Sequence, residues 1–254
     1  MRYVLLSAGE LQPWVLPAAG LGVAAAGIAA LRLSTYSQLE YITAAMLARH
    51  VKAGGARVLQ LGGSTRDIFY YPAGTVQVTV GGPEVSAGLW EQAGMQAKVP
   101  VQAVKAEPQK VLSSQAGSTA DSIVLLNQLQ QWGDMQQLLS QVYRVLKPGG
   151  TLIFVQRLQG GPLQPLLGGS AGAVDPTLID QIQDYVGWDF VQVDAALRGS
   201  DLHAVGVAVK PLAAAGSGST SAAGSVDAAA FEAVMRRGKG KRQQQQTGGF
   251  QQKS

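Results

Sequence analysis

The amino-acid sequence predicts an α/β fold: a mostly parallel sheet of seven strands, covered by helices and ending in an antiparallel strand. Short apolar segments alternate with segments of helical periodicity, which is typical of a parallel sheet buried on both faces. The expected strands are 57–61, 76–80, 99–104, 122–126, 151–155, 190–193 and 204–209. The last two flank Gly199, so we expect them to pair antiparallel.

Three helices are predicted, over 39–51, 134–146 and 175–185. Ser37 and Glu40 have the spacing of a capping box before the first helix, and a Gly-Gly pair follows it. The second helix has an apolar stripe made of Met135, Leu138, Leu139, Val142 and Val145. Asp175 and Pro176 are suited to the N-cap and the first position of the third helix.

Composition limits the chemistry of the protein. The chain has 254 residues, which fits one domain with appended segments. Hydrophobic residues make up 46% of it and charged residues 14%, so a large core is available. The absence of cysteine excludes disulfides, iron–sulfur clusters and thiolate zinc sites. His50 and His203 are far apart, and no carboxylates have ligand spacing, so we expect no metal.

Residues 1–33 form an apolar N-terminal segment. No charged residue occurs from Leu11 to Leu31, a length sufficient for a helix to cross a bilayer. Basic residues such as Arg32 and Arg49 follow, which places the domain on the cytoplasmic, stromal or matrix side, with a plastid or mitochondrion as candidate organelles. We interpret the segment as a membrane anchor. The alternatives are the apolar region of a targeting peptide and a buried helix.

Residues 212–254 are expected to form a flexible tail that is basic and rich in glutamine. The tail begins with a Gly/Ala/Ser linker. A short helix after Ser225 would carry Phe231, Val234 and Met235 on one side, suited to docking on a protein partner. The basic run after this helix allows contact with RNA or anionic lipid. A solvated tail is favoured instead, because no aromatic residues interleave the basic run.

The main domain is expected to span residues 34–211, with its ligand site beyond the carboxyl ends of the strands. Ligands of such sheets bind where the strand order switches. The first strand runs into Gly62 and Gly63, which allow the backbone to approach a ligand closely. We therefore expect a side chain at Gly62 to harm ligand binding more than folding.

Three stretches resemble a known family: VLQLGGSTRDIFYYP, VQVTVGGPE and DSIVLLNQLQQWGDMQQLLSQVYRVLKPGGTLIFVQ. They are similar to type 11 S-adenosylmethionine-dependent methyltransferases, and within them to the membrane-anchored methyltransferase-like branch. The resemblance spans Val58 to about Val155 and implies a class I, Rossmann-like methyltransferase fold. It also implies S-adenosylmethionine as cofactor. The cofactor-binding positions implied are Gln60, Leu61, Gly62, Gly63, Ser64, Thr65, Gly82 and Asn127.

The departures from the family pattern concern this cofactor site. The family has an acid on the first strand where this chain has Gln60, and two of its three glycines fall on Ser64 and Arg66. The acid that binds the ribose hydroxyls falls on Gly81 or Gly82, and losing such a contact costs about 1.5–3 kcal/mol. Arg66 also adds a positive charge that would oppose a cationic ligand. These departures predict an eroded site.

Other candidate residues are few. Asp67, Tyr70 and Tyr71 follow the glycine turn and are candidates for lining a pocket, with half-buried aromatics as the alternative for the tyrosines. Asn127 ends the fourth strand, where this fold often contacts substrate. His203 is a candidate base at a strand end, where a structural role is more usual. No catalytic residue is assigned.

Three interpretations of function follow. The first is a methyltransferase-like protein with an eroded cofactor site, a pseudo-enzyme if inactive; if active, it would methylate a small or lipid-like acceptor. The alternative is a non-enzymatic scaffold or assembly subunit of a membrane-associated complex, in contact with the membrane and with protein partners. A membrane-tethered adaptor whose tail engages RNA or lipid is a third interpretation. The fold alone does not decide between them.

Overall fold

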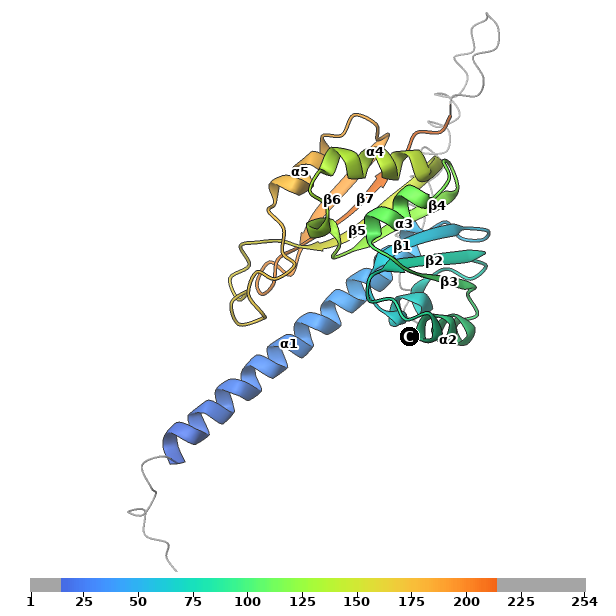
Figure 1. Cartoon of the computed structure of the whole chain (residues 1–254). Coiled ribbons are helices and arrows are strands. Elements are labelled where there is room, and N and C mark those ends of the chain that lie inside the picture. The colour runs from blue at the N-terminus through green and yellow to red at the C-terminus, as the bar shows by residue number, and fades with distance from the viewer. Residues whose placement is uncertain (1–14, 214–254) are drawn as a thin grey trace, which may run out of the picture. The chain divides into compact units, whose positions relative to one another are not determined.

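The computed structural model describes residues 15–213, with side chains from residue 23 onward (Figure 1). Its seven strands form one sheet in the order β3-β2-β1-β4-β5-β7-β6. The strands are β1 Arg57–Gly62, β2 Gln77–Gly82, β3 Val101–Lys105, β4 Ala120–Leu126, β5 Leu146–Arg157, β6 Phe190–Ala196 and β7 His203–Val209. Only β7 runs antiparallel to its neighbours, β5 and β6. The predicted fold class is confirmed.

The described helices are α1 Val15–His50, α2 Ala87–Ala97, α3 Pro108–Ser114, α4 Met135–Val145 and α5 Thr177–Gln183, with short 3-10 helices η1 Thr65–Tyr70 and η2 Leu129–Gln131. α4 begins as predicted, because the Asp134 carboxylate accepts from the backbone N–H groups of Gln136 and Gln137. The sequence did not predict α2 or α3. It also predicted that a helix begins near Ser37, but Ser37 lies inside α1.

The core forms a layer on each face of the sheet. Side chains alternate along β1, so Leu59 and Leu61 pack toward α3, α4 and α5, while Val58 packs on the other face with Leu47 of α1 and Trp90 of α2. Phe154 of β5 is fully buried in the first layer. These two layers hold the strands so that the ends of β1, β2 and β4 lie together.

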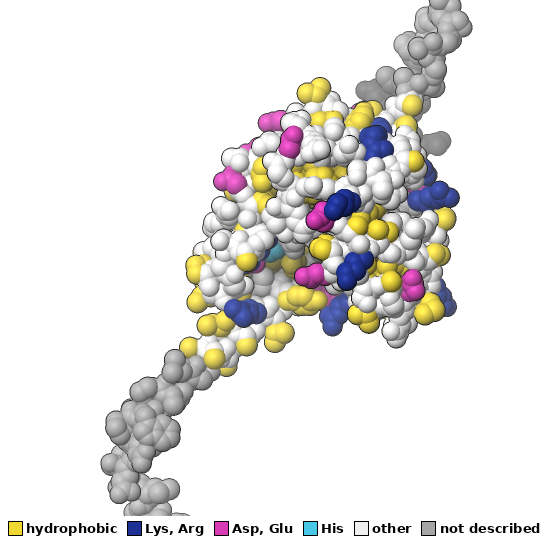
Figure 2. Space-filling view, viewed as in Figure 1, with side chains coloured by type: hydrophobic (Ala, Val, Ile, Leu, Met, Phe, Trp, Pro, Cys, Tyr) yellow, Lys and Arg dark blue, Asp and Glu magenta, His cyan; other side chains and the backbone are white. Residues whose placement is uncertain are grey.

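The C-terminal part of α1 packs on the sheet, while its N-terminal part is exposed. Leu47 is fully buried, and the hydroxyl of Thr151 on β5 donates to the carbonyl of His50 at the end of α1. From residue 23 to residue 34, every side chain is exposed except two that are partly buried. Figure 2 shows hydrophobic side chains along this part of the helix. Within the described residues, no helix is both long and apolar enough to cross a bilayer.

Two predicted segments extend beyond the described part of the chain. The linker, short helix and basic tail after residue 213 lie outside the described residues, as do residues 1–14 of the predicted anchor. The predicted boundary between residues 33 and 34 falls within α1.

Candidate functional site

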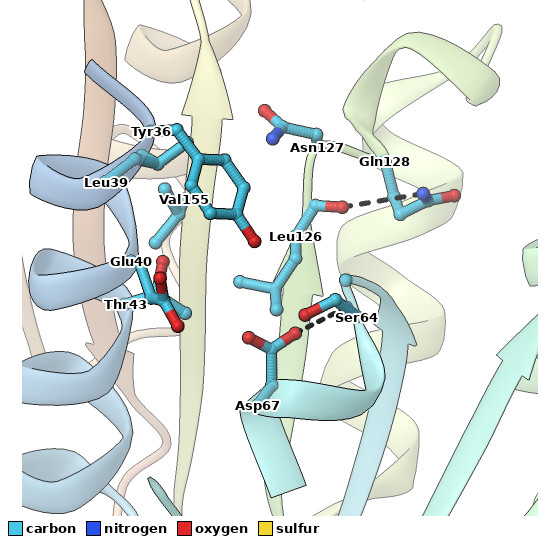
Figure 3. A pocket seen from close by; sticks show the side chains of 11 residues that line it. Tyr36, Leu39, Glu40, Thr43, Ser64, Asp67, Leu126, Asn127, Gln128 and Val155 are labelled. Atoms are coloured by element: carbon cyan, nitrogen blue, oxygen red, sulfur yellow. Dashed lines mark hydrogen bonds between the residues drawn. The ribbon is translucent and has the colours of Figure 1, made fainter. Parts of the chain in front are cut away.

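Two neighbouring cavities lie at the carboxyl ends of the strands, near the point where the strand order reverses between β1 and β4. The α1 cavity, about 340 Å³, has walls that include Tyr36, Leu39, Glu40, Asp67, Leu126 and Val155 (Figure 3). The β2 cavity, also about 340 Å³, has walls that include Gly81, Gly82, Glu84, Val85, Trp90 and Gln131. Gly63 and Gln128 line both cavities, so the two spaces meet at the turn after β1.

The turn after β1 requires glycine for two reasons. Gly62 and Gly63 have φ of +77° and +85°, a left-handed conformation that side chains disfavour. A Cβ on Gly62 would also approach the backbone oxygen of Leu126 to 2.4 Å. This geometry argues against the expectation that a side chain at Gly62 harms binding more than folding. The collision is with the neighbouring strand, so the first effect falls on the fold.

Gln60 organises this turn from inside the core. Its side chain is fully buried, and its amide nitrogen donates to the carbonyl of Gly62 at 2.9 Å and to Asp67 Oδ2 at 3.3 Å. Its amide oxygen accepts from the hydroxyl of Tyr71 at 2.8 Å. Gln60 lines neither cavity, nor do Leu61 and Thr65, so three predicted cofactor positions act at a distance from the ligand space.

Asp67 places a buried carboxylate in the α1 cavity. Its Oδ2 accepts from the backbone N–H of Ser64 at 2.6 Å and from Gln60. No hydrogen bond to Oδ1 occurs within residues 15–213, and Figure 3 shows that oxygen directed into the cavity. Burial raises the pKa of Asp67, and the nearby charge of Glu40 adds to the rise. The carboxyl group from η1 is thus fixed through one oxygen and available through the other.

Glu40 brings a second carboxylate from α1 to the same cavity. It accepts from the hydroxyl of Tyr70 at 2.6 Å and lies 3.5 Å from the guanidinium of Arg66. The hydrogen bond to Glu40 raises the pKa of Tyr70 to about 12. The Arg66 side chain is 63% exposed and lines neither cavity. Its charge therefore pairs with Glu40 outside the ligand space rather than opposing a cation inside it.

The two glycines that end β2 differ in the space around them. A Cβ on Gly81 would meet Val111 at 2.7 Å, whereas one on Gly82 would meet only Val85, at 3.3 Å. Only Gly82 therefore has room for a side chain. Glu84 lies two residues beyond the strand and lines the β2 cavity with an exposed carboxylate. Sequence reasoning missed Glu84, although it is the first acidic residue after this strand.

The end of β4 supplies polar groups between the cavities. Asn127 has φ of +52°, and its side-chain oxygen accepts from the backbone N–H of Arg157, so the side chain holds β4 to β5 while it lines the α1 cavity. Gln128 donates weakly to the carbonyl of Leu126 at 3.4 Å. The buried Oε1 of Gln128 has no partner within the described residues, so it is an acceptor that a ligand would satisfy.

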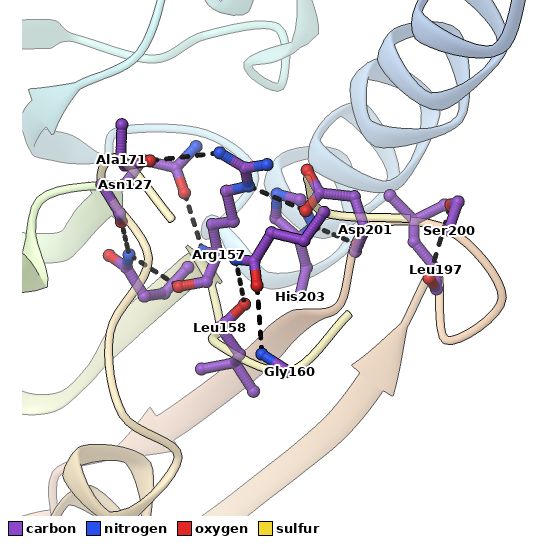
Figure 4. Close-up of polar contacts among 12 residues, drawn as sticks. Asn127, Arg157, Leu158, Gly160, Ala171, Leu197, Ser200, Asp201 and His203 are labelled. Atoms are coloured by element: carbon purple, nitrogen blue, oxygen red, sulfur yellow. Dashed lines mark hydrogen bonds and ion pairs between the residues drawn. The ribbon is translucent and has the colours of Figure 1, made fainter. Parts of the chain in front are cut away.

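His203 is held in a structural network rather than a cavity (Figure 4). Its side chain is 2% exposed, and Nδ1 lies 2.7 Å from the carbonyl oxygen of Asp201. Burial lowers the pKa of His203, which favours the neutral ring. The Asp201 carboxylate pairs with Arg157 at 2.8 Å. His203 lines neither the α1 cavity nor the β2 cavity.

Comparisons with known proteins agree with this arrangement. A family model described as "Methyltransferase domain" matches residues 59–154. A search of curated proteins gives no match. The [4+2]-cyclase SpnF is similar in structure at 16% identity, with a TM-score of 0.52 over 68% of this chain and 80% of that one. A possible exported protein from Bordetella parapertussis is similar at 14% identity, with a TM-score of 0.51 over 70% and 68%.

The likenesses to solved structures concern the fold alone, while the family model covers the strands and turns that build the two cavities. The matched residues run from β1 through β5, and so include the glycine turn, the end of β2 and the end of β4. Residues 59–154 are therefore similar to a methyltransferase domain, and the sheet around them has the class I, Rossmann-like methyltransferase fold.

Proposed function

We propose that this protein binds S-adenosylmethionine across the two cavities and transfers its methyl group to an acceptor in the α1 cavity. One observation carries the proposal. The cavities meet at Gly63 and Gln128, and carboxylates stand on both sides of that junction, Glu84 in one cavity and Glu40 with Asp67 in the other. This arrangement suits a ligand with ribose hydroxyls at one end and positive charge at the other.

The β2 cavity is suited to the nucleoside half of the cofactor. A carboxylate accepts two hydrogen bonds at once, and Glu84 offers such a group at the end of β2. Trp90 and Val85 supply apolar surface for a base. The unpartnered Oε1 of Gln128 adds an acceptor at the junction. In this proposal Glu84 performs the role that the missing acid at Gly82 would have had.

The α1 cavity is suited to the charged end of the cofactor and to the acceptor. S-adenosylmethionine supplies a methyl group activated by a positively charged sulfur. Asp67 contributes a negative potential there, Arg66 pairs with Glu40 at the edge of the cavity, and no Lys, Arg or His lines it. Leu126 and Val155 provide apolar walls that limit water. Methyl transfer depends chiefly on proximity and alignment, so the absence of an assigned base does not exclude it.

A second candidate is a non-enzymatic subunit of a larger assembly, as the sequence departures suggest. The observation in its favour is that β2 ends without a carboxylate and that the side chain of Glu84, two residues later, is exposed to solvent rather than fixed by packing. The fold does not settle the reaction, since a [4+2]-cyclase is similar in structure. Membrane contact through residues 1–33 belongs to this candidate. The exposed apolar side chains of α1 support such a membrane contact.

Calorimetric titration of the full chain with S-adenosylhomocysteine, which is not turned over, separates the two candidates. The first predicts a 1:1 complex that Glu84→Gln weakens about tenfold or more, because a hydrogen bond to a charged group contributes about 1.5–3 kcal/mol. Glu91→Gln is the matched control, since Glu91 lies on α2 and lines neither cavity. Absence of binding at millimolar ligand would instead support the non-enzymatic subunit.

A further inference from the structure

We propose that the protein forms a two-fold symmetric dimer in which the outer strand β3 pairs antiparallel with β3 of a second copy of this chain. The inference goes beyond the proposed function and does not depend on it. It rests on the backbone groups that β3 presents at the edge of the sheet, on the register in which these groups match a second copy, and on the charged groove beside that edge.

β3 presents a row of backbone groups at one edge of the sheet. Within the described residues it pairs with β2 alone, and Figure 1 shows it as the outermost strand on that side. The backbone N–H of Val78 on β2 donates to the carbonyl of Pro100 at 2.9 Å. Because alternate residues of a strand bond the same neighbour, every second residue from Pro100 onward faces β2. The residues between them direct their N–H and C=O groups outward: Val101, Ala103 and Lys105.

These outward groups are complementary to themselves. In an antiparallel pair, two opposed residues exchange both of their hydrogen bonds when both face the partner strand. A two-fold axis at Ala103 places this residue opposite its own copy and Val101 opposite Lys105 of the second copy, so every outward residue of β3 meets another outward residue. Registers shifted by one or two residues leave outward groups without a partner. The edge therefore fits a second copy in one register.

The groove beside β3 suits the side chains that this register brings to it. The groove encloses about 360 Å³, and its walls include Glu91 and Met95 of α2 and Val101 of β3. Met95 is 75% exposed. Val101 packs toward α2, and side chains alternate along a strand, so Lys105 points to the same side of the sheet. Lys105 of the second copy would therefore enter this groove and cover Met95 with its carbon chain.

The charges of the groove complement the second copy. Glu91 and Lys98 line the groove about two helical turns apart, so it carries opposite charges at its two ends. The ammonium group of Lys105 from the second copy is attracted to Glu91 and repelled by Lys98, which directs it toward Glu91. The two-fold axis repeats this ion pair on the other side of the dimer. Such a pair fixes the register, while the backbone hydrogen bonds and the burial of Met95 contribute affinity.

Sedimentation equilibrium of the full-length protein in mild detergent, over a range of protein concentrations, tests the dimer. We expect a reversible equilibrium between monomer and dimer. Ala103→Pro should raise the dissociation constant about tenfold or more, because proline has no N–H to donate to the second copy. The fold should survive this change, since the N–H that is lost faces outward from an edge strand. Far-UV circular dichroism checks that the variant is folded.

Exchanging the two charges tests the register. Lys105→Glu should weaken the dimer about tenfold or more, because it brings like charges together, and the double variant Lys105→Glu/Glu91→Lys should restore it. Lys110→Glu is the matched control. Lys110 lies on α3, where it pairs with Glu107 at 3.0 Å, and it does not line the groove, so this change should leave the dimer intact.

Three results would overturn the proposal. A monomer at every concentration would show that the edge of β3 does not pair with a second copy. A dimer that neither Ala103→Pro nor Lys105→Glu weakens would place the interface elsewhere on the protein. A dimer that Lys105→Glu weakens and the double variant fails to restore would contradict the register centred on Ala103.

Discussion

Gly82→Asp tests the proposed ribose site by adding the carboxylate that the end of β2 lacks. Gly82 is not among the glycines with positive φ, and an added Cβ would meet only Val85, at 3.3 Å. A small shift of that valine accommodates the side chain, so the variant should fold. The substitution is best made in the Glu84→Gln protein, because in the wild-type protein the Glu84 carboxylate would repel the new one.

The expected gain follows from the hydrogen bonds that the new carboxylate would accept. Contacts of this kind contribute about 1.5–3 kcal/mol, which corresponds to about a ten- to hundredfold change in affinity. Calorimetry with S-adenosylhomocysteine should show Glu84→Gln losing such a factor and Gly82→Asp restoring it. Gly81→Asp is the control, because its Cβ would meet Val111 at 2.7 Å and should cost stability without restoring affinity. No gain from a folded Gly82→Asp/Glu84→Gln protein would refute the placement of the ribose.

Three further predictions concern stability. Leu47→Ala should cost about 2–5 kcal/mol in urea unfolding, because this side chain of α1 is fully buried against the sheet, whereas Leu33→Ala, 70% exposed, should change little. Equal effects would show that α1 does not pack as described. Gly62→Ala should lower the free energy of unfolding of the domain. Gly88→Ala, with open space around its Cβ in α2, should raise it by about 0.5–1 kcal/mol. A stable Gly62→Ala protein would contradict the collision with Leu126. Because burial raises the pKa of Asp67, its ionisation opposes folding above that pKa. Asp67→Asn should therefore raise the melting temperature at pH 7 by an amount that shrinks as the pH falls, and a gain that grows toward low pH would reverse this sign.

The sheet was predictable from sequence because its strands are apolar runs bounded by turn residues. All seven expected strands exist, with ends that differ by a few residues or, at β5, by five. The helices α2 and α3 were missed for physical reasons. α2 contains two glycines, and two of its three large apolar side chains, Leu89 and Met95, are exposed, so no clear apolar stripe marks it. α3 has seven residues, too few to show a helical period.

The start of α1 was misplaced because a local capping signal competed with helix continuation. Ser37 and Glu40 have capping-box spacing, but the residues before them contain no helix breaker between Gly27 and Ser34. Extending an existing helix costs less than starting a new one, so the helix runs through both segments. The boundary predicted between residues 33 and 34 therefore does not separate two structural elements.

The site was predictable only in part. The glycine turn was identifiable, since Gly62 and Gly63 follow a buried strand. The carboxylates were not, because Glu40 reaches the cavity from α1 and no local pattern indicates that α1 lies beside the turn after β1. Asp67 was named only as one of several pocket candidates, and Glu84 was overlooked because the family pattern drew attention to Gly81 and Gly82.

The central claim is that one S-adenosylmethionine molecule spans both cavities, and a crystal structure of the full chain with S-adenosylhomocysteine tests it most directly. In that structure we expect the ribose hydroxyls to be hydrogen-bonded to Glu84 and the sulfur to lie beside Gly63, facing the space between Tyr36 and Asp67. Cavities left empty at saturating ligand would contradict the account, as would a ligand whose sulfur faces away from α1.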